Sequence, residues 1–265
     1  MRHDKYKNII LKIFLLGLLM VLSGCGGTGG IDRSNSLIVI DAGHGGHDSG
    51  ARAEGRLEKD LVLAITKKLY TKLKRQGYRV YYTRNDDRFL KLGERTRIAD
   101  HKDAKVFVSI HANAIANKSR FNIVEGVETY FLQKTRDARS QRIASRENAS
   151  VLQGTDALSK EVIIDSVLNG PKIIQSHKLA IDVQNSIVSK LRSKYNNVKD
   201  GGVRPAPFYV LVGASRPSIL VEVGYITNDK ERQRLFTHNY QDNIAQGIAQ
   251  GIGRYIDNRK KEVGF

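Results

Sequence analysis

From Leu37 onward, short apolar runs rich in β-branched residues alternate with longer segments of helical period. This alternation is typical of an α/β fold, in which helices link parallel strands and cover the faces of the sheet. We therefore predict a single α/β domain over residues 37–257, with a twisted, mostly parallel central sheet flanked by helices. The predicted strands are 37–40, 79–83, 106–110, 126–132, 208–212 and 218–223, and the predicted helices are 57–77, 173–191 and 244–256.

Residues 133–170 fit this plan poorly, because they separate a predicted strand from a predicted helix by far more than the usual few residues. Long connections of this kind are often lids or binding loops. We expect a helical regulatory insertion at about 133–170 and a short C-terminal tail at 258–265. We find no linker that would divide the chain into two domains.

The first 25 residues have the order of a secretory signal: basic side chains, an apolar run of about fourteen residues, then Leu22-Ser23-Gly24-Cys25. The run is short for a membrane span, which needs roughly twenty residues. The last four residues resemble the lipobox of bacterial lipoproteins, which implies cleavage after residue 24 and lipidation of Cys25. The alternative is an uncleaved anchor with a buried cysteine. We expect residues 1–24 to be a signal peptide and residues 25–36 a lipidated, flexible tether.

The net charge of the chain limits the classes of partner that it can bind. There are 44 Lys and Arg against 27 Asp and Glu, a net charge of +17, and residues 1–24 hold four basic side chains and one acidic one, so the mature chain keeps +14. Such a charge attracts nucleic acid, anionic lipid or a carboxylate-rich polymer. A secreted chain does not meet the chromosome, and this one lacks the interleaved aromatic residues of nucleic-acid-binding modules. We therefore expect the bacterial wall, and no nucleic acid, as the anionic partner.

Polar side chains stand near the carboxyl ends of three predicted strands, where α/β sheets gather their functional groups. His44 follows the first strand, His111 ends the third and Glu222 lies in the last. Each has an ordinary explanation, since a lone histidine at a strand end is commonly structural and Glu222 alone could pair with a basic side chain. Together they suit a catalytic zinc site, which uses three protein ligands and keeps one position open. With one cysteine in the chain, any further ligand must be His or a carboxylate, and several candidates remain.

Four motifs then follow one another in a specific order. They are Ile-Asp-Ala-Gly-His-Gly-Gly-His-Asp-Ser-Gly-Ala at 40–51, Leu-Glu-Lys-Asp at 57–60, Ser-Ile-His-Ala-Asn-Ala at 109–114 and Leu-Val-Glu-Val-Gly at 220–224. This set resembles the zinc-dependent N-acetylmuramoyl-L-alanine amidases of the third amidase family. The resemblance covers about residues 37–257.

The resemblance implies a set of functional residues. The zinc ligands of the family correspond to His44, Glu58 and His111, and its catalytic glutamate corresponds to Glu222. One Zn²⁺ per chain would polarise the carbonyl of the amide that joins the muramic acid lactyl group to L-alanine, and would activate the attacking water. Glu222 would take the proton of that water and pass it to the leaving amine. Without the resemblance, Glu58 could simply stabilise the positive end of a helix dipole.

Three further residues stand beside the implied ligands. Asp41, Asp48 and Asn113 are candidates for orienting those ligands through hydrogen bonds. Turn and strand-end hydrogen bonding explains the same residues equally well. Arg95 also matches a position of the family, and we expect a structural role for it.

The insertion contains a segment of helical composition, 139–152, in which Ile143, Glu147 and Val151 share one face. It resembles the inhibitory helix of cell-division amidases, which covers the zinc cleft until an activator protein of the degenerate endopeptidase type displaces it. We expect Glu147 to occupy the open zinc position in the resting enzyme. The alternative is an ordinary surface helix.

The sequence as a whole predicts a lipid-anchored zinc amidase that removes stem peptides from peptidoglycan, in wall remodelling and daughter-cell separation. The alternatives are a zinc carboxypeptidase acting on the same stem peptides and a non-catalytic peptidoglycan-binding lipoprotein. The second alternative predicts a lost ligand, and all four implied positions are kept. We expect the protein at the periplasmic face of the envelope. Gly26, rather than an Asp retention residue, follows Cys25, so we expect the outer membrane rather than the inner one.

Overall fold

The computed structural model describes residues 33–149 and 171–263, all within one unit that starts at Arg33. Cys25, the predicted signal peptide, most of the tether and residues 150–170 of the insertion lie outside the described residues. The strands are β1 (Leu37–Ala42), β2 (Arg52–Ala53), β3 (Arg56–Leu57), β4 (Arg79–Tyr82), β5 (Val106–Asn113), β6 (Val127–Leu132), β7 (Asp200–Ala206) and β8 (Ser218–Tyr225). The helices are α2 (Glu58–Arg75), α3 (Leu92–His101), α4 (Ala138–Glu147), α7 (Pro171–Arg192), α8 (Asp229–Leu235) and α9 (His238–Val263), with 3₁₀ turns η1 (Lys118–Arg120) and η2 (Tyr209–Leu211).

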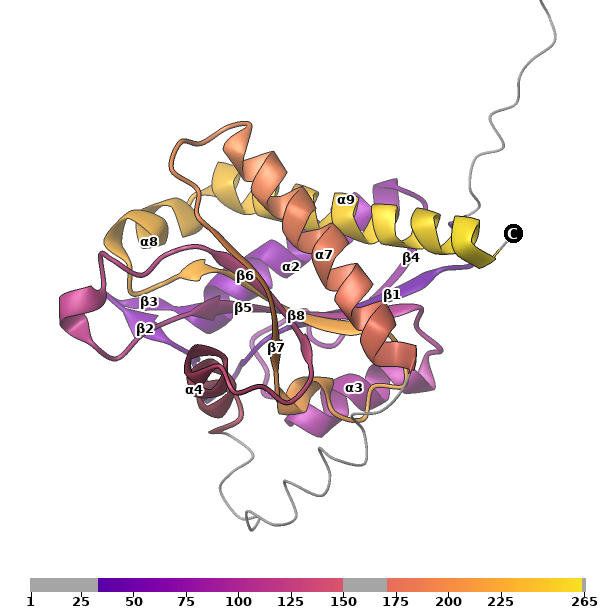
Figure 1. Cartoon of the computed structure of the whole chain (residues 1–265), viewed down its shortest axis with the longest axis horizontal. Helices are drawn as coiled ribbons and strands as arrows, with labels where there is room; N and C mark the ends of the chain where they lie inside the picture. Colours follow the sequence, from indigo (N-terminus) through magenta and orange to yellow (C-terminus); the bar gives the residue numbers. More distant parts are fainter. Residues whose placement is uncertain (1–32, 150–170, 264–265) are drawn as a thin grey trace, which may run out of the picture. The chain divides into compact units, whose positions relative to one another are not determined.

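Six strands form the central sheet in the order β4-β1-β5-β8-β6-β7 (Figure 1). Strands β4, β1, β5 and β8 are parallel to one another, β6 runs antiparallel to β8, and β7 is parallel to β6. The predicted α/β class with a mostly parallel sheet flanked by helices is therefore confirmed.

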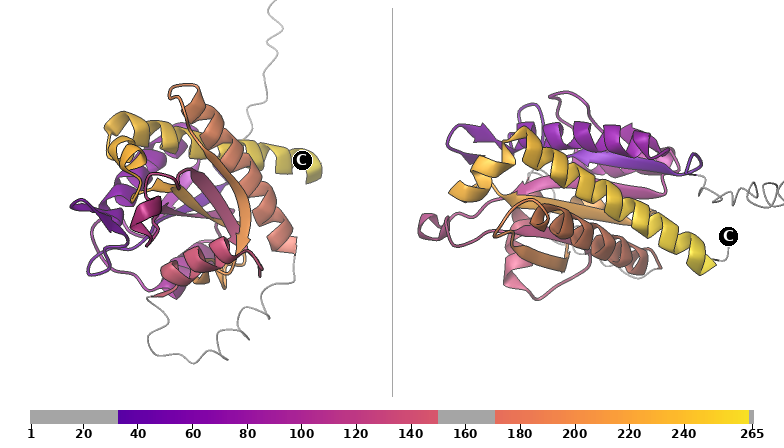
Figure 2. Two further views of the ribbon diagram at one scale, coloured as in Figure 1. Left: turned by 60° about the vertical axis from the view of Figure 1, so that its left-hand side comes forward. Right: turned by 90° about the horizontal axis from the view of Figure 1, so that it is seen from above.

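Helices cover both faces of this sheet, because successive side chains of a strand point to opposite faces. On one face, Ile38, Ile40 and alternate residues of β5 and β8 pack against α2, α7 and α9. On the other face, Val39, Phe107 and Leu220 pack against α3, α4 and η2. Figure 2 shows α2, α7 and α9 together on the first face. The site described below lies on the second face.

The structure corrects one predicted strand and extends other predictions. Residues 208–212 were expected to form a strand but contain η2, while the outer strand is β7, at residues 200–206. Strand β7 contains Pro205 and two glycines, which a strand tolerates at the edge of a sheet. Helix α3 was not predicted, and α9 continues through residues 258–263, which we had expected to be tail. Among the described helices, none combines the length and the apolar character that crossing a membrane requires.

Candidate metal centre

Three acidic or imidazole side chains meet on the α4-facing side of the sheet. His111 on β5, Glu222 on β8 and Glu128 on β6 are all buried. His111 lies opposite Glu222 in the register of β5 and β8, and Glu222 lies opposite Glu128 in the register of β8 and β6. Side chains of neighbouring strands that lie opposite each other point to the same face. The fold therefore gathers these three residues in one row across the sheet.

His44 lies just beyond β1 in a turn of unusual backbone geometry. Its φ of 60° is in the left-handed region, which is costly for a residue other than glycine. Gly43 packs against the ring of His111, and a Cβ at that position would overlap the ring. The glycine therefore allows the two imidazoles to approach, with ring centroids 4.9 Å apart and planes at 76°.

Two buried arginines hold this turn by its carbonyl groups. Arg95 donates from Nη1 to Ala42 O at 2.7 Å and from Nη2 to His44 O at 2.9 Å. Arg84 donates from Nη2 to Gly43 O at 2.7 Å. The contacts of Arg95 agree with the structural role predicted for it. Sequence analysis missed Arg84, because nothing in the polar segment after β4 distinguishes it from a surface arginine.

Glu58 is the first residue of α2 and is fully buried. The short β2–β3 hairpin leads into it. Its Oε2 accepts a hydrogen bond from Ala51 N and its Oε1 one from Ala112 N, both at 2.8 Å. Gly50 has a φ of 61°, and a Cβ there would lie 2.6 Å from Glu58 Oε2. The carboxylate is thus fixed by backbone groups on both sides.

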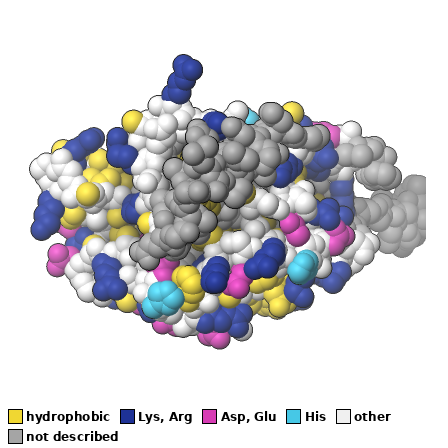
Figure 3. All heavy atoms as spheres, turned by 90° about the horizontal axis from the view of Figure 1, so that it is seen from below, with side chains coloured by type: hydrophobic (Ala, Val, Ile, Leu, Met, Phe, Trp, Pro, Cys, Tyr) yellow, Lys and Arg dark blue, Asp and Glu magenta, His cyan; other side chains and the backbone are white. Residues whose placement is uncertain are grey.

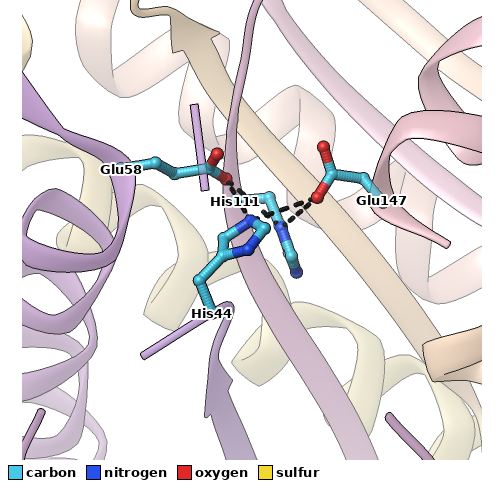
Figure 4. A group of neighbouring side chains, drawn as sticks. All are labelled: His44, Glu58, His111 and Glu147. Atoms are coloured by element: carbon cyan, nitrogen blue, oxygen red, sulfur yellow. Dashed lines mark ion pairs between the residues drawn. The ribbon is translucent and has the colours of Figure 1, made fainter. Parts of the chain in front are cut away.

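Glu147, the last residue of α4, completes a group of four side chains (Figure 4). Its Oε2 lies 3.1 Å from both His44 Nε2 and His111 Nδ1. Glu58 Oε1 lies 3.1 Å and 3.3 Å from the same two nitrogens. We call His44, Glu58, His111 and Glu147 the four-donor group. It contains the three predicted metal ligands and the predicted inhibitory residue.

The four-donor group fits a divalent metal ion. Its ligand atoms all lie within 4.8 Å of one another. Donors around a tetrahedral zinc ion, each about 2.0–2.1 Å from the metal, stand roughly 3.3 Å apart, close to the spacings of 3.1 and 3.3 Å found here. His44 Nε2, His111 Nδ1 and Glu147 Oε2 are buried and have no hydrogen-bond partner within the described residues. Such atoms are costly to bury, and imidazole and carboxylate are donors that zinc accepts.

The charges inside the group are strongly coupled. Burial lowers the pKa of His111, but the adjacent carboxylates of Glu147 and Glu58 outweigh burial and raise the pKa to about 9. Burial raises the pKa of Glu58, but the charge of His44 and the close contacts of both imidazoles outweigh burial and bring the pKa to about 2. A dication at the centre would neutralise the two carboxylates in place of two protons.

Glu222 lies beside the four-donor group with both carboxylate oxygens buried. Neither oxygen has a hydrogen-bond partner within the described part of the chain. Burial, followed by the charge of Glu147, raises the pKa of Glu222 well above its usual range. The guanidinium of Arg146 approaches it to 3.8 Å, from Nη2 to Oε1. A carboxyl group with a raised pKa can exchange protons near neutral pH.

Only one of the three residues predicted to orient ligands touches a member of the group. Asp48 Oδ2 lies 3.0 Å from His44 Nδ1, which leaves Nε2 of the same ring to face the other donors. Asp41 is paired with Arg95 at 2.8 Å, and Arg95 in turn donates to the carbonyl oxygen of His44. Asn113 contacts none of the four, and its amide nitrogen donates to Tyr225 OH at 3.0 Å.

A buried network around Glu128 was missed by sequence analysis. Glu128 Oε2 accepts hydrogen bonds from Asn113 Nδ2 at 3.2 Å, Tyr130 OH at 2.9 Å and Tyr225 OH at 3.1 Å. Its Oε1 pairs with Arg139 of α4. A signal was present, because Glu128 interrupts an apolar run in the same way as Glu222 does.

Helix α4 is held against the sheet beyond the contacts of Glu147. Ile143 and its neighbours pack into the core of that face. Arg146 Nη1 donates to Ala114 O at 2.5 Å, and Asn148 Nδ2 donates to Pro207 O at 2.9 Å. At the N-terminal end of α4, the ion pair of Arg139 with Glu128 adds a further contact. The helix is thus joined to β6, to the segment after β5 and to the segment after β7.

Comparison with known proteins gives a consistent result. The family described as N-acetylmuramoyl-L-alanine amidase matches residues 38–254. The N-acetylmuramoyl-L-alanine amidase AmiC of Escherichia coli O6:H1 is 34% identical over 237 residues, which cover 87% of this chain and 55% of AmiC. The chain therefore spans about half the length of that relative.

Solved structures resemble the fold over most of its length. The N-acetylmuramoyl-L-alanine amidase from Clostridium difficile 630 is 34% identical, with a TM-score of 0.63 and coverage of 85% of this chain and 98% of that one. The CwlD amidase from Clostridioides difficile, solved in complex with the GerS lipoprotein, is 27% identical, with a TM-score of 0.62 and coverage of 84% and 99%.

Proposed function

The chain belongs to the N-acetylmuramoyl-L-alanine amidase family, and from this membership we propose that it is a zinc enzyme. It is an amidase that acts on peptidoglycan and hydrolyses the amide bond between the muramic acid lactyl group and L-alanine. His44, Glu58 and His111 are the proposed ligands of one zinc ion per chain. The observation that carries this proposal is the buried four-donor group, whose spacing and donor types suit the metal.

The proposed mechanism assigns proton transfer to Glu222. A zinc ion held by His44, Glu58 and His111 would supply a Lewis acid to polarise the scissile carbonyl and to activate a water molecule. Glu222 takes a proton from that water and delivers it to the amine of L-alanine as the bond breaks. Its two oxygens are buried without hydrogen-bond partners in the described residues, which leaves them available for this transfer. Asp48 keeps the ring of His44 in the orientation that directs Nε2 inward.

Mass spectrometry of the products from purified peptidoglycan tests this function. We propose the full-length chain in detergent with added zinc, carrying Glu147→Ala so that inhibition does not hide the activity. The expected product is an intact stem peptide with a free L-alanine amino terminus. Adding Glu222→Gln should slow its release by about 10²- to 10⁴-fold, whereas Glu54→Gln, at an exposed acid, should not. Shortened stems still attached to muramic acid would instead identify a carboxypeptidase.

We further propose that α4 is an autoinhibitory helix. Glu147 stands where a fourth metal ligand would stand, and a catalytic zinc site needs that position open for water. Arg146 in addition lies 3.8 Å from Glu222. The closed helix thus blocks the open position of the metal and places a positive charge beside the proposed base. The four-donor group and the packing of Ile143 support this proposal.

Displacement of α4 needs a partner, and we propose an activator protein of the degenerate endopeptidase type acting in daughter-cell separation. A related amidase, CwlD, has been solved in complex with the GerS lipoprotein, which supports the binding of a partner protein. Addition of candidate activators to the wild-type chain should raise its activity toward the level of the Glu147→Ala variant. An activator that raises the activity of that variant as strongly would contradict displacement as its mode of action.

We also propose that residues 1–24 are a signal peptide and that Cys25 carries the lipid. The protein would then be anchored at the periplasmic face of the envelope, preferably at the outer membrane, with residues 25–36 as its tether. Fractionation of cells that express the wild type and Cys25→Ser tests this. The variant is expected in the soluble periplasmic fraction, and its retention in membranes would refute the lipid anchor.

A further inference from the structure

A pocket lies next to the four-donor group and is lined by none of its four side chains. It has a volume of about 580 Å³ and lies between α4 and the segment that follows β5. Its apolar lining includes Ile115, Val124 and Ile143. Figure 3 views the protein from the side on which α4 lies, and dark blue Lys and Arg side chains are spread across that side.

Four arginines line this pocket. Arg139, Arg142 and Arg146 come from α4, and Arg120 comes from η1. No acidic side chain lines the pocket among the residues that the structure describes. We call it the arginine pocket.

Two of the four arginines have acidic partners and two do not. Arg139 is paired with Glu128, and Arg146 with Glu147. Arg120 and Arg142 are exposed and form no ion pair with any described residue. The arginine pocket therefore combines an apolar lining with two guanidinium groups whose charge no described acidic side chain balances. Guanidinium groups bind carboxylates through two parallel hydrogen bonds.

We propose that the arginine pocket binds a peptide that carries carboxylates, with Arg120 and Arg142 as the groups that recognise them. The apolar lining receives the remainder of the peptide. Stem peptides of the wall have this chemistry, and their choice as ligand rests on the proposed function. The carboxylates are present both in stems that are attached to the glycan and in stems that have been released. The attached form lacks a free amine, whereas the released form carries an ammonium group that would face the arginines.

A ligand of the arginine pocket bridges two parts of the protein. Three of the arginines belong to α4 and one belongs to the segment after β5. A ligand that needs both parts binds only when α4 is in the position seen here, and it therefore stabilises that position. Its binding should slow amide hydrogen exchange in α4 and in residues 114–124.

Calorimetric titration at low salt tests the pocket, with the full-length chain in detergent. The probes are the dipeptide L-Ala-D-Glu, its N-acetyl form, which imitates an attached stem, and its diamide, which lacks carboxylates. We expect the first two to bind and the diamide not to bind. Arg120→Gln and Arg142→Gln should each weaken binding about tenfold, and Arg136→Gln, at an exposed arginine outside the pocket, should leave it unchanged.

The outcomes separate this proposal from the proposed function. None of the dipeptides contains the lactyl amide, so none is a substrate. An inactive protein that still binds the acidic dipeptides would refute only the proposed function. The proposed binding would be overturned if Arg142→Gln bound as tightly as the wild type or if the diamide bound. It would also be overturned if exchange protection were confined to residues outside α4 and 114–124. Tighter binding of the N-acetyl form would identify attached stems as the source, and tighter binding of the free form would identify released ones.

Discussion

Replacement of Glu147 by alanine should activate the enzyme without any partner. The substitution removes the contacts of Oε2 with His44 Nε2 and His111 Nδ1, both at 3.1 Å. With zinc bound by these nitrogens, Oε2 is the fourth ligand, and its loss should cost the closed helix about 3 kcal/mol, the upper value for a hydrogen bond to a charged group. Since about 1.4 kcal/mol corresponds to a factor of ten, the equilibrium between closed and open α4 should shift toward the open state on the order of a hundredfold. Activity rises by that factor only until the open state dominates.

The assay is release of dye from labelled peptidoglycan by the full-length chain with zinc. Ser145→Ala, at an exposed position of α4, is the matched control and should behave like the wild type. Glu147→Gln keeps one oxygen near the histidines and should give an intermediate rate. The gain must disappear in the double variant with Glu222→Gln, because it depends on the same site. A Glu147→Ala protein that is folded and binds zinc, yet is no more active than the wild type, would refute the reasoning.

Three other results are expected. In a competition titration, Gly43→Ala should reduce zinc affinity at least tenfold, because its Cβ would displace the ring of His111. The control Gly93→Ala, with no atom within 4 Å of its Cβ position, should bind zinc normally. Chelation should abolish activity and lower the melting temperature by roughly several degrees, since the metal binds the folded state; an unchanged melting curve would contradict a metal inside the four-donor group. Burial raises the pKa of Glu231 from 4.5 to about 7, so the stability that it contributes is complete below pH 4.5 and is lost as the pH rises through 7. Melting temperatures between pH 5 and pH 8 should therefore fall less in Glu231→Gln than in the wild type, and parallel curves would assign the loss to another group.

Strand ends made the centre of the site predictable from the sequence. His44, His111 and Glu222 each interrupt or end an apolar run, and parallel strands bring such positions to one edge of a sheet. Glu58 was assigned only through the resemblance to a family, because an acid at a helix start has an ordinary explanation. Glu147 was proposed from its position between apolar residues on one helix face, and the structure places it 3.1 Å from both histidines.

Interactions between distant segments were not predictable in the same way. Arg84 and Arg95 hold backbone carbonyl groups of the turn at His44, and neither apolar periodicity nor spacing identifies such partners. Strand β7 was missed because its glycines and Pro205 lower its β propensity, and its place depends on pairing with β6. The neighbouring apolar run 208–212 was mistaken for a strand, since core packing of Phe208 gives the same pattern without a ladder of hydrogen bonds.

The connection from β6 to β7 has a consequence for how this family could diversify. These two strands are adjacent and parallel, and everything between them, α4 included, is a single crossover. The residues proposed for chemistry lie on β5 and β8 and beside β1 and α2, none of which belongs to that crossover. Helix α7 of this crossover packs in the core, but the part between β6 and α7 can be shortened, lengthened or exchanged while the two strands stay paired. Control of the enzyme could therefore be gained, lost or redirected to a new partner by changes between β6 and α7, without altering the catalytic residues.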